Sequence, residues 1–560
     1  MGKASWVALC LSVLFIAVML RVSHLGDADY GLDEIFHVYV AQELINGDPP
    51  ILPSGFHYER GLPYSYLVAI AGSVGGFNET ALRMPSVLFG VLVIALVYGF
   101  TARWYSAFAG LIAAFITTFS PIEVALSREV RMYTMLQFLF LLIAFLFYEG
   151  FETSSSQHHP HPGRALLKTW FVPYEVRPIF LLWAGLLFLL AWRVHALIQP
   201  AMSGIIAYML VMAGMAVVMK GLPRPLRQKY MVSGLAVLLG GIVGSVLFPE
   251  KVAKLLAESH SIPLFYEERA YNWNYFRWEL LDEYPIIFGT LTFSFLVCIV
   301  KQPKLGLFLG VVFVVPFLLH SLVFTFKTYR YIFHLLPLMY IAAAVGISAC
   351  LSSVWSAGCR LNAKASVPSN LWTVIVAGTL GAAMMGMLIN MPWFMRTVKD
   401  YSTDFQLPHF ADVQHHHWKK AMAYIIQHQK EGDVIISASA IHTKYYGASQ
   451  PLYAMNDVRL RLNMYRNLQD EYGNLIDYAS GAVVLKDLED VKRVLREHHS
   501  GWFMTYLWRR ERFWNHPDRL IPVTGTFPDE VFRYLDGNLE RKTIPGVPDI
   551  AVWRWSREEK

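Results

Sequence analysis

The sequence WVALCLSVLFIAVMLRV at residues 6–22 is followed, after a short polar stretch, by YGLDEIFH at residues 30–37. The first segment is apolar along its length and is longer than the apolar core of a cleaved signal peptide. No small-x-small cleavage site precedes the polar stretch that follows Arg21. We therefore expect residues 6–22 to be a membrane anchor, which places the acidic pair Asp33 and Glu34 next to the membrane surface.

Apolar runs continue through most of the chain. A transmembrane helix needs roughly 20 mostly apolar residues, and by that criterion we count about eleven spans. The runs lie at residues 6–22, 84–102, 107–126, 132–149, 179–192, 196–219, 230–249, 286–300, 305–326, 331–351 and 371–391. A shorter run at residues 63–76 better fits a re-entrant or interfacial segment. Only 16% of the residues are charged, the mean hydropathy is +0.37 and there are four cysteines. These values exclude a single soluble domain and a disulfide scaffold.

The positions of the basic residues predict how the chain crosses the membrane. Segments rich in Lys and Arg alternate with the apolar runs so that they share one side with the N-terminus, and the positive-inside rule makes this side cytoplasmic. These segments are residues 220–229, 301–304 and 352–370. The outer face then holds residues 23–83, the loops at 120–131, 192–195, 250–285 and 327–330, and everything after Met391. The pattern fits a multi-pass protein of a bacterial inner (plasma) membrane with a periplasmic C-terminal region. A net charge of +6 carried mostly between apolar runs does not indicate nucleic-acid binding.

The last part of the chain predicts a separate small domain. Strand-like runs lie at residues 432–438, 481–485 and 501–506, and helical patterns lie at 418–430 and 488–498. Alternating strands and helices are typical of an α/β domain. The expected fold is thus an α-helical polytopic membrane protein with a C-terminal extracytoplasmic α/β domain. We place the boundary between residues 1–391, which include interfacial helices in the first outer loop, and residues 392–560.

Ionisable residues are scarce at mid-depth in the apolar runs. Glu123, His195, His320 and His334 lie near the ends of the predicted helices. Ion-coupled transporters usually need acids or bases inside the bundle, so this distribution argues against a proton- or sodium-driven pump. The polar chemistry gathers in the outer loops, which predicts a functional cavity at the outer membrane face.

The acidic pair opens a predicted amphipathic helix. Apolar residues recur at helical spacing after it (Ile35, Val38, Ala41 and Ile45), and residues 46–50 (NGDPP) end the helix. Such a helix can lie flat in the membrane interface. Adjacent helical residues point about 100° apart. One acid can therefore face the cavity as a general base while the other holds a loop or a metal, and the alternative is that Asp33 only caps the helix.

Three short strings resemble a known superfamily. An Asp-Glu pair directly after the first span is similar to that of the GT-C membrane glycosyltransferases, most closely the protein O-mannosyltransferases and the lipid A aminoarabinose transferases. Residues 127–133 (SREVRMY) resemble their Ser-x-Glu-Ala-Arg-x-Tyr string, with Val130 in place of the usual Ala. Residues 329–337 (YRYIFHLLP) resemble an Arg-Tyr string ending in Leu-Pro that opens a late span. The order and membrane side of the three strings make the combination more specific than any one of them.

The resemblance implies a glycosyltransferase that moves a sugar from a polyprenyl-phosphate carrier to an acceptor hydroxyl at the outer face. A single base implies inversion at the anomeric carbon. The chemistry needs a carboxylate to take the hydroxyl proton and cations to stabilise the departing phosphate. The candidate catalytic residues are Asp33, which is the base in the family, and Glu34. The candidate phosphate ligands are Arg131, Lys327, Arg330 and His195. The candidate residues that position the acceptor are Glu129, Tyr133, His57 and Tyr58.

Other interpretations of these residues stay open. The cations can snorkel at helix ends, and Glu129 can form a structural ion pair with Arg131. We assign no metal ligands, because the contiguous histidines at 415–417 and 158–161 lack the spacing of a folded site. No cofactor is required by the resemblance, although related oligosaccharyltransferases use a divalent cation, so one at the acidic pair is the alternative.

The expected partners are a lipid-linked sugar donor, a glycan, lipid or protein acceptor, and membrane lipids. The sequence contains no glycine-rich phosphate loop, which is consistent with a lipid-phosphate donor rather than a nucleotide. The competing functions are a flippase or transporter of lipid-linked sugars and a non-catalytic membrane scaffold.

Overall fold

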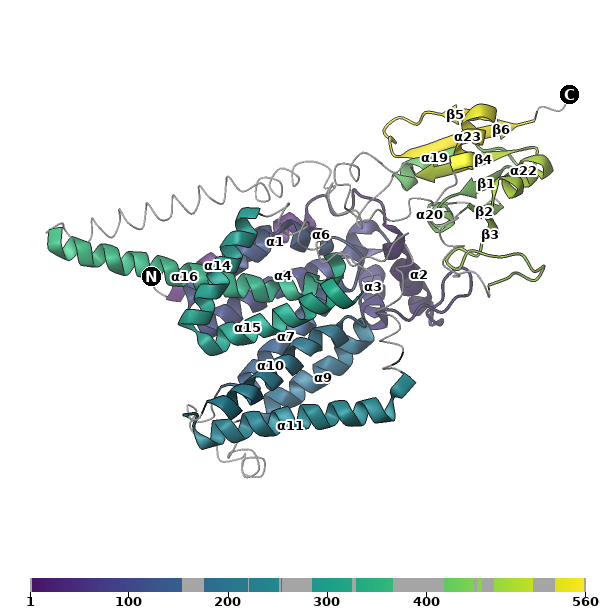
Figure 1. Ribbon diagram of the computed structural model, residues 1–560. Helices are drawn as coiled ribbons and strands as arrows, with labels where there is room; N and C mark the ends of the chain where they lie inside the picture. Colours follow the sequence, from purple (N-terminus) through teal and green to yellow (C-terminus); the bar gives the residue numbers. More distant parts are fainter. Residues whose placement is uncertain are drawn as a thin grey trace.

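The computed structural model describes a helical bundle and a small sheet domain (Figure 1). The described residues are 3–153, 176–219, 221–250, 253, 285–324, 329–365, 417–447, 451–455, 468–506 and 529–557. The predicted span at 371–391, the predicted domain boundary and Lys327 lie outside these ranges.

Long apolar helices occupy the predicted spans in the described part of the chain. They are α1 (Lys3–Val22), α4 (Glu79–Trp104), α5 (Ala107–Phe119), α7 (Tyr133–Phe151), α9 (Pro178–Val194), α10 (Ile198–Val218), α11 (Arg224–Leu247), α14 (Pro285–Lys301), α15 (Pro303–Leu318) and α16 (Leu336–Ala365). Within the described residues, six helical segments are long and apolar enough to cross a membrane by length and composition. The predicted polytopic helical fold is confirmed.

Shorter helices and turns lie in the predicted outer loops or at the ends of the predicted spans next to them. They are α2 (Leu32–Asn46), α3 (Leu62–Gly75), α6 (Pro121–Leu126), a π-helix η3 (Leu319–Val323) and the 3₁₀ turns η4 (Tyr329–Tyr331) and η5 (Phe333–Leu335). Helix α2 ends where Gly47 takes a φ of 83°, a left-handed conformation that favours glycine. Helix α3 matches the short apolar run and begins with a proline in its first turn.

Helix α2 is enclosed more completely than its sequence pattern predicts. The expected apolar residues Ile35, Val38 and Ala41 are fully buried, whereas Ile45 is 43% exposed. Phe36 and the residues next to it are buried as well. The helix packs against α3 and against helix α20 (Ala440–Tyr445) of the sheet domain. Protein therefore covers the first part of α2 beyond the predicted stripe, whereas the end of the helix at residues 45–46 is exposed.

The C-terminal domain is a mixed sheet with helices, as the strand and helix pattern predicts. Its elements are α19 (Trp418–His428), β1 (Val434–Ser437), α20 (Ala440–Tyr445), β2 (Leu452–Met455), β3 (Val483–Leu485), α22 (Leu488–Glu497), β4 (Ser500–Tyr506), α23 (Asp529–Asn538), β5 (Glu540–Lys542) and β6 (Ile550–Ser556). In the described residues the strand order is β3-β2-β1-β4-β6-β5. Strands β1 to β4 are parallel, and β6 is antiparallel to both of its neighbours. Buried side chains cover both faces, including Phe503 and Trp553 on one and Ile435 and Trp502 on the other.

Candidate active site

Asp33 lies in the first turn of α2 and meets two arginines from distant loops. Its Oδ2 accepts a hydrogen bond from Arg330 Nη1 at 2.7 Å and lies 3.1 Å from Arg131 Nη2. Arg131 also donates from Nη1 to the backbone oxygen of Asp33 at 3.0 Å. Arg131 comes from the loop between α6 and α7, and Arg330 belongs to η4. The structure thus brings three of the residues selected from the sequence into direct contact.

This cluster is ionised and partly open. The Asp33 side chain is 36% exposed, while that of Arg131 is 1% exposed. Burial works to raise the pKa of the Asp33 carboxyl, but the guanidinium groups of Arg131 and Arg330 outweigh it and hold that pKa well below its ordinary value. Burial likewise opposes the charge of Arg131, yet the Asp33 carboxylate raises the pKa of Arg131 above its ordinary value. The result is an exposed carboxylate backed by buried positive charge.

Tyr133 forms a platform beside the ion pairs. The guanidinium carbons of Arg131 and Arg330 lie 5.2 Å and 5.8 Å from the centre of its ring. Arg131 Nη2 donates to the Tyr133 hydroxyl at 3.2 Å. The His195 ring lies 5.5 Å away, between centroids. The ring therefore fixes the guanidinium planes by cation–π contact and hydrogen bonding.

Arg60 adds a cation that the sequence analysis did not select. Its Nη2 lies 2.7 Å from Nε2 of His195, which follows the last residue of α9. Burial, together with the positive charges of Arg60 and Arg131, lowers the pKa of His195 to about 2. The ring is therefore neutral, and its Nδ1 accepts the backbone N–H of Leu197 at 3.0 Å. The sequence signal for Arg60 was its position as a basic residue directly before Gly61, the N-cap of α3.

The two residues selected near Arg60 have different surroundings. Tyr58 packs its ring 5.6 Å from that of His37 and 5.4 Å from that of Phe36, on the inner side of α2. Burial raises the pKa of its hydroxyl, and the charges of Arg131 and Asp33 act on the same pKa in opposite directions. His57 is exposed and bridges to Ile51 through its backbone. Within the described residues, no contact joins His57 to Asp33.

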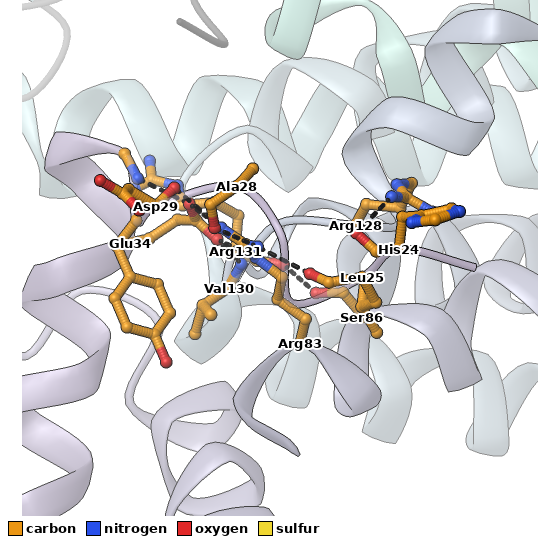
Figure 2. Close-up of polar contacts among 12 residues, drawn as sticks. His24, Leu25, Ala28, Asp29, Glu34, Arg83, Ser86, Arg128, Val130 and Arg131 are labelled. Atoms are coloured by element: carbon orange, nitrogen blue, oxygen red, sulfur yellow. Dashed lines mark hydrogen bonds and ion pairs between the residues drawn. The ribbon is translucent and has the colours of Figure 1, made fainter. Parts of the chain in front are cut away.

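Glu34 has partners other than those of Asp33 and connects several loops (Figure 2). Arg83 of α4 donates to both of its carboxylate oxygens, at 3.0 Å and 3.1 Å. The carboxylate also accepts from the backbone N–H of Val130 at 2.6 Å and of Gly31 at 2.7 Å. The second of these bonds is half of a capping box at the start of α2. Glu34 therefore connects the N-terminus of α2 to α4 and to the second outer loop.

Arg83, which the sequence analysis also missed, extends this connection. Its guanidinium donates to the carbonyls of Leu25 and Ala28, each at 2.8 Å, and of Asp29 at 3.0 Å (Figure 2). Its side chain is 1% exposed. In the sequence it looks like a cation at the start of a membrane span, because its acidic and carbonyl partners are distant along the chain.

Glu129 is a buried acid with an unusual environment. Glu129 lies in the loop before α7, and the residue is 6% exposed. In the described part of the protein, its Oε1 has no hydrogen-bond partner. Burial, reinforced by the negative charge of Glu34, raises the pKa of Glu129 to about 8. The expected ion pair with Arg131 is not among the contacts of the described residues, which instead include a backbone bond from Arg131 N to Glu129 O at 2.8 Å.

The acidic pair does not fit a divalent cation. Asp33 faces Arg131 and Arg330, and Glu34 faces Arg83, so each carboxylate already neutralises positive charge. A metal ion there would be repelled by the same guanidinium groups. Among the described residues, no group of three or more His, Cys, Asp or Glu side chains is placed to hold a metal ion.

The helical bundle, the acid at the start of its first outer helix and the C-terminal sheet domain can be compared with known proteins. The family model of the dolichyl-phosphate-mannose-protein mannosyltransferases matches residues 59–220. The fold is similar to that of the crystal structure of ArnT from Cupriavidus metallidurans, with 14% identity, a TM-score of 0.54 and coverage of 99% of this chain and 98% of that chain. The predicted resemblance is thus found with the mannosyltransferase family model over residues 59–220 and, at the level of the fold, with ArnT.

Two further solved structures extend the comparison. ArnT from Cupriavidus metallidurans bound to undecaprenyl phosphate matches with 14% identity, a TM-score of 0.53 and coverage of 99% and 98% of the two chains. The oligosaccharyltransferase AglB from Archaeoglobus fulgidus, in complex with an inhibitory peptide and a dolichol-phosphate, matches with 12% identity and a TM-score of 0.54. That match covers 90% of this chain and 69% of AglB. A search of curated proteins found no match.

Proposed function

We propose that this protein is a membrane glycosyltransferase that moves a sugar from a polyprenyl-phosphate carrier to an acceptor hydroxyl at the outer face of the membrane. The observation that carries the proposal is the cluster in which Asp33 shares its charge with Arg131 and Arg330. Structures of the same fold hold undecaprenyl phosphate in ArnT and dolichol-phosphate in AglB, which supports a lipid-phosphate donor.

The arginines supply the groups that the leaving phosphate needs. When the bond between the anomeric carbon and the phosphate oxygen breaks, its electron pair stays on the phosphate, whose negative charge increases. Guanidinium groups bind phosphate through paired N–H donors, and fixed cations stabilise this charge in the transition state. Arg131 is held by Asp33 and Tyr133, so it is already oriented before the donor arrives. Arg60 and Arg330 lie at the more open side of the cluster.

Asp33 takes the proton of the acceptor hydroxyl as the new bond to the anomeric carbon forms. In the empty site it is a weak base, because the arginines hold its pKa low. A donor phosphate competes for the same guanidinium groups, so the pKa of Asp33 returns toward its ordinary value once the donor is bound. This competition couples donor binding to activation of the base. Attack from the side opposite the phosphate inverts the anomeric configuration.

Glu34 and Arg83 act as positioning residues in this proposal. They fix the start of α2 against α4 and against Val130, and thereby set the distance between Asp33 and Arg131. The positive-inside pattern supports an outer-face site with the C-terminal domain on the same side, in a bacterial inner membrane.

Mass spectrometry of envelope glycans tests the proposal in cells. A strain that lacks this protein should lose one glycan modification, and the wild-type gene should restore it. The anomeric configuration of the restored sugar tests inversion, which retention of configuration would contradict.

Reconstituted vesicles distinguish transfer from transport. We expect purified protein to consume lipid-linked sugar only when an acceptor extract is added. If the protein moves the lipid-linked sugar across vesicles without any acceptor, the flippase alternative is correct and the enzyme proposal fails.

A further inference from the structure

The C-terminal sheet has the topology of a ligand-binding fold. The chain runs from β1 outward to β2 and β3, and then returns to place β4 on the other side of β1, with all of these strands parallel. In open sheets of this kind, ligands bind outside the carboxyl ends of the strands, at the point where the strand order reverses. Here that point lies between β1 and β4, next to residues 438–439 and the start of α20.

The chain's own first outer loop contacts α20, the helix that follows this point. His442 of α20 donates from Nε2 to the backbone oxygen of Tyr30 at 3.0 Å. The backbone N–H of Tyr30 donates to the hydroxyl of Tyr446 at 2.9 Å. The ring of Tyr445 meets the ring of Tyr30 edge-on, with centroids 5.5 Å apart. Tyr30 is fully buried, and both of its backbone polar groups bond to the sheet domain.

The residues that hold Tyr30 are themselves fixed. Ser439 Oγ lies 2.6 Å from Nδ1 of His442, which leaves Nε2 to carry the hydrogen that the Tyr30 carbonyl accepts. The imidazole also stacks on the indole of Trp418, with ring centroids 5.2 Å apart and planes 15° from parallel. The ring therefore has one defined orientation.

The sheet domain also bonds to Asp29, the residue before Tyr30. The backbone N–H of Lys419 donates to Asp29 Oδ2 at 2.7 Å, and its Nζ lies 3.1 Å from Glu79 at the start of α4. From the opposite side, Arg83 holds the carbonyl of Asp29. Residues 25–31, which we call the strap, are thus clamped between the bundle and the sheet domain.

The strap leads directly into the proposed base. Gly31 caps α2, and Asp33 lies three residues after Tyr30. The Asp33 carboxylate depends on contacts of 2.7 Å and 3.1 Å, so a small movement of Tyr30 would break its pairing with the arginines. Misplacement of a reacting group by about 1 Å can cost about a hundredfold in rate.

We propose that the C-terminal domain is a clamp that positions the proposed base, with the strap held as an intramolecular ligand by α19 and α20. His442 and Tyr446 are its positioning residues. The proposal rests on the proposed glycosyl transfer, with Asp33 as the base. It assigns the domain a role in catalysis.

Full-length variants in membranes test the clamp. Tyr446→Phe removes one oxygen atom, and His442→Ala removes the ring that bonds Tyr30. We expect both to lower kcat for transfer by about tenfold to a hundredfold, with little change in KM for the donor. His442→Gln, which keeps an N–H donor, should recover most of the rate. His428→Ala is the matched control, because His428 is exposed on α19 and bonds only locally, to the Tyr424 carbonyl.

Hydrogen exchange gives a readout that does not depend on transfer. In His442→Ala and Tyr446→Phe, backbone exchange at residues 25–36 should rise, while β1 and β4 stay as protected as in the wild type. Looser strap residues with an unchanged kcat would overturn the clamp. Unchanged exchange in both variants would overturn it as well. If the strap loosens but the wild-type protein transfers no sugar, the clamp contact is supported and the proposed function fails.

Discussion

Replacing Asp33 by asparagine separates the two parts of the proposed site. Asparagine has nearly the same size as aspartate but cannot accept the acceptor's proton. It also removes the negative charge that lies 2.7 Å from Arg330 and 3.1 Å from Arg131. We therefore expect opposite effects on the two steps: transfer slows, whereas the lipid phosphate binds more tightly.

The magnitudes follow from the geometry. Loss of a general base typically costs about 10²–10⁴ in rate, or about 3–5 kcal/mol in the activation barrier. The Asp33 side chain is 36% exposed, so solvent weakens its ion pairs. Freeing the two arginines from these ion pairs should therefore improve the free energy of phosphate binding by about 1 kcal/mol. A gain of this size corresponds to about fivefold tighter binding of a lipid phosphate.

Both effects can be measured on the same preparation. Purified Asp33→Asn protein is titrated with undecaprenyl phosphate, and binding is followed by the rise in unfolding temperature. Transfer is measured with a lipid extract that contains the donor and an envelope extract that contains the acceptor. If the variant transfers sugar at the wild-type rate, Asp33 is not the base. If binding and transfer fall together, Asp33 serves only to hold the arginines in place.

Further predictions concern the surrounding residues. Arg330→Gln removes a charge-assisted phosphate contact worth about 1.5–3 kcal/mol, so affinity for undecaprenyl phosphate should fall about tenfold or more; Arg103→Gln, at the other end of α4, should leave it unchanged. Glu34→Gln and Arg83→Met should each lower the free energy of unfolding by about 3–5 kcal/mol, since each leaves a buried partner unpaired. The double variant should lose less free energy of unfolding than the two single variants lose together. Additive losses, measured by thermal unfolding, would refute the coupling between Glu34 and Arg83. Because the pKa of Glu129 rises on folding from its ordinary value near 4.5 to about 8, the wild type should lose stability as the pH rises through this window. Glu129→Gln should have the same unfolding temperature as the wild type at pH 4 and a higher one above pH 8. If the difference in unfolding temperature becomes smaller as the pH rises, the raised pKa of Glu129 is contradicted.

The central pairing could be predicted from sequence because it rests on short local strings. Asp33, Arg131 and Arg330 each stand in a recognisable string, and the alternation of basic loops places all three on one membrane side. The pattern of strands and helices likewise predicted the sheet domain before its pairing was known. Hydrophobic length alone predicted the long helices, since the bilayer sets their minimum extent.

The supporting contacts could not be predicted, because they depend on partners far along the chain. Arg83 has the sequence context of an ordinary cation at a span boundary, and only the folded protein reveals that it bonds both Glu34 and the strap. His442 stands in a polar segment without a motif. The stripe on α2 predicts one buried face, whereas the structure also buries Phe36 and His37, because both α3 and α20 pack against the helix. Periodicity within one helix carries no information on contacts from a later domain.

The site depends on residues that are widely separated in synthesis. Arg330 follows Asp33 by 297 positions, and Tyr446 follows Tyr30 by 416. A nascent chain that has inserted only as far as α11 possesses the carboxylate but lacks both its second guanidinium partner and its C-terminal support. Under the proposed function, a chain terminated before η4 therefore lacks a phosphate ligand, and one terminated before α20 lacks the residues that hold Tyr30.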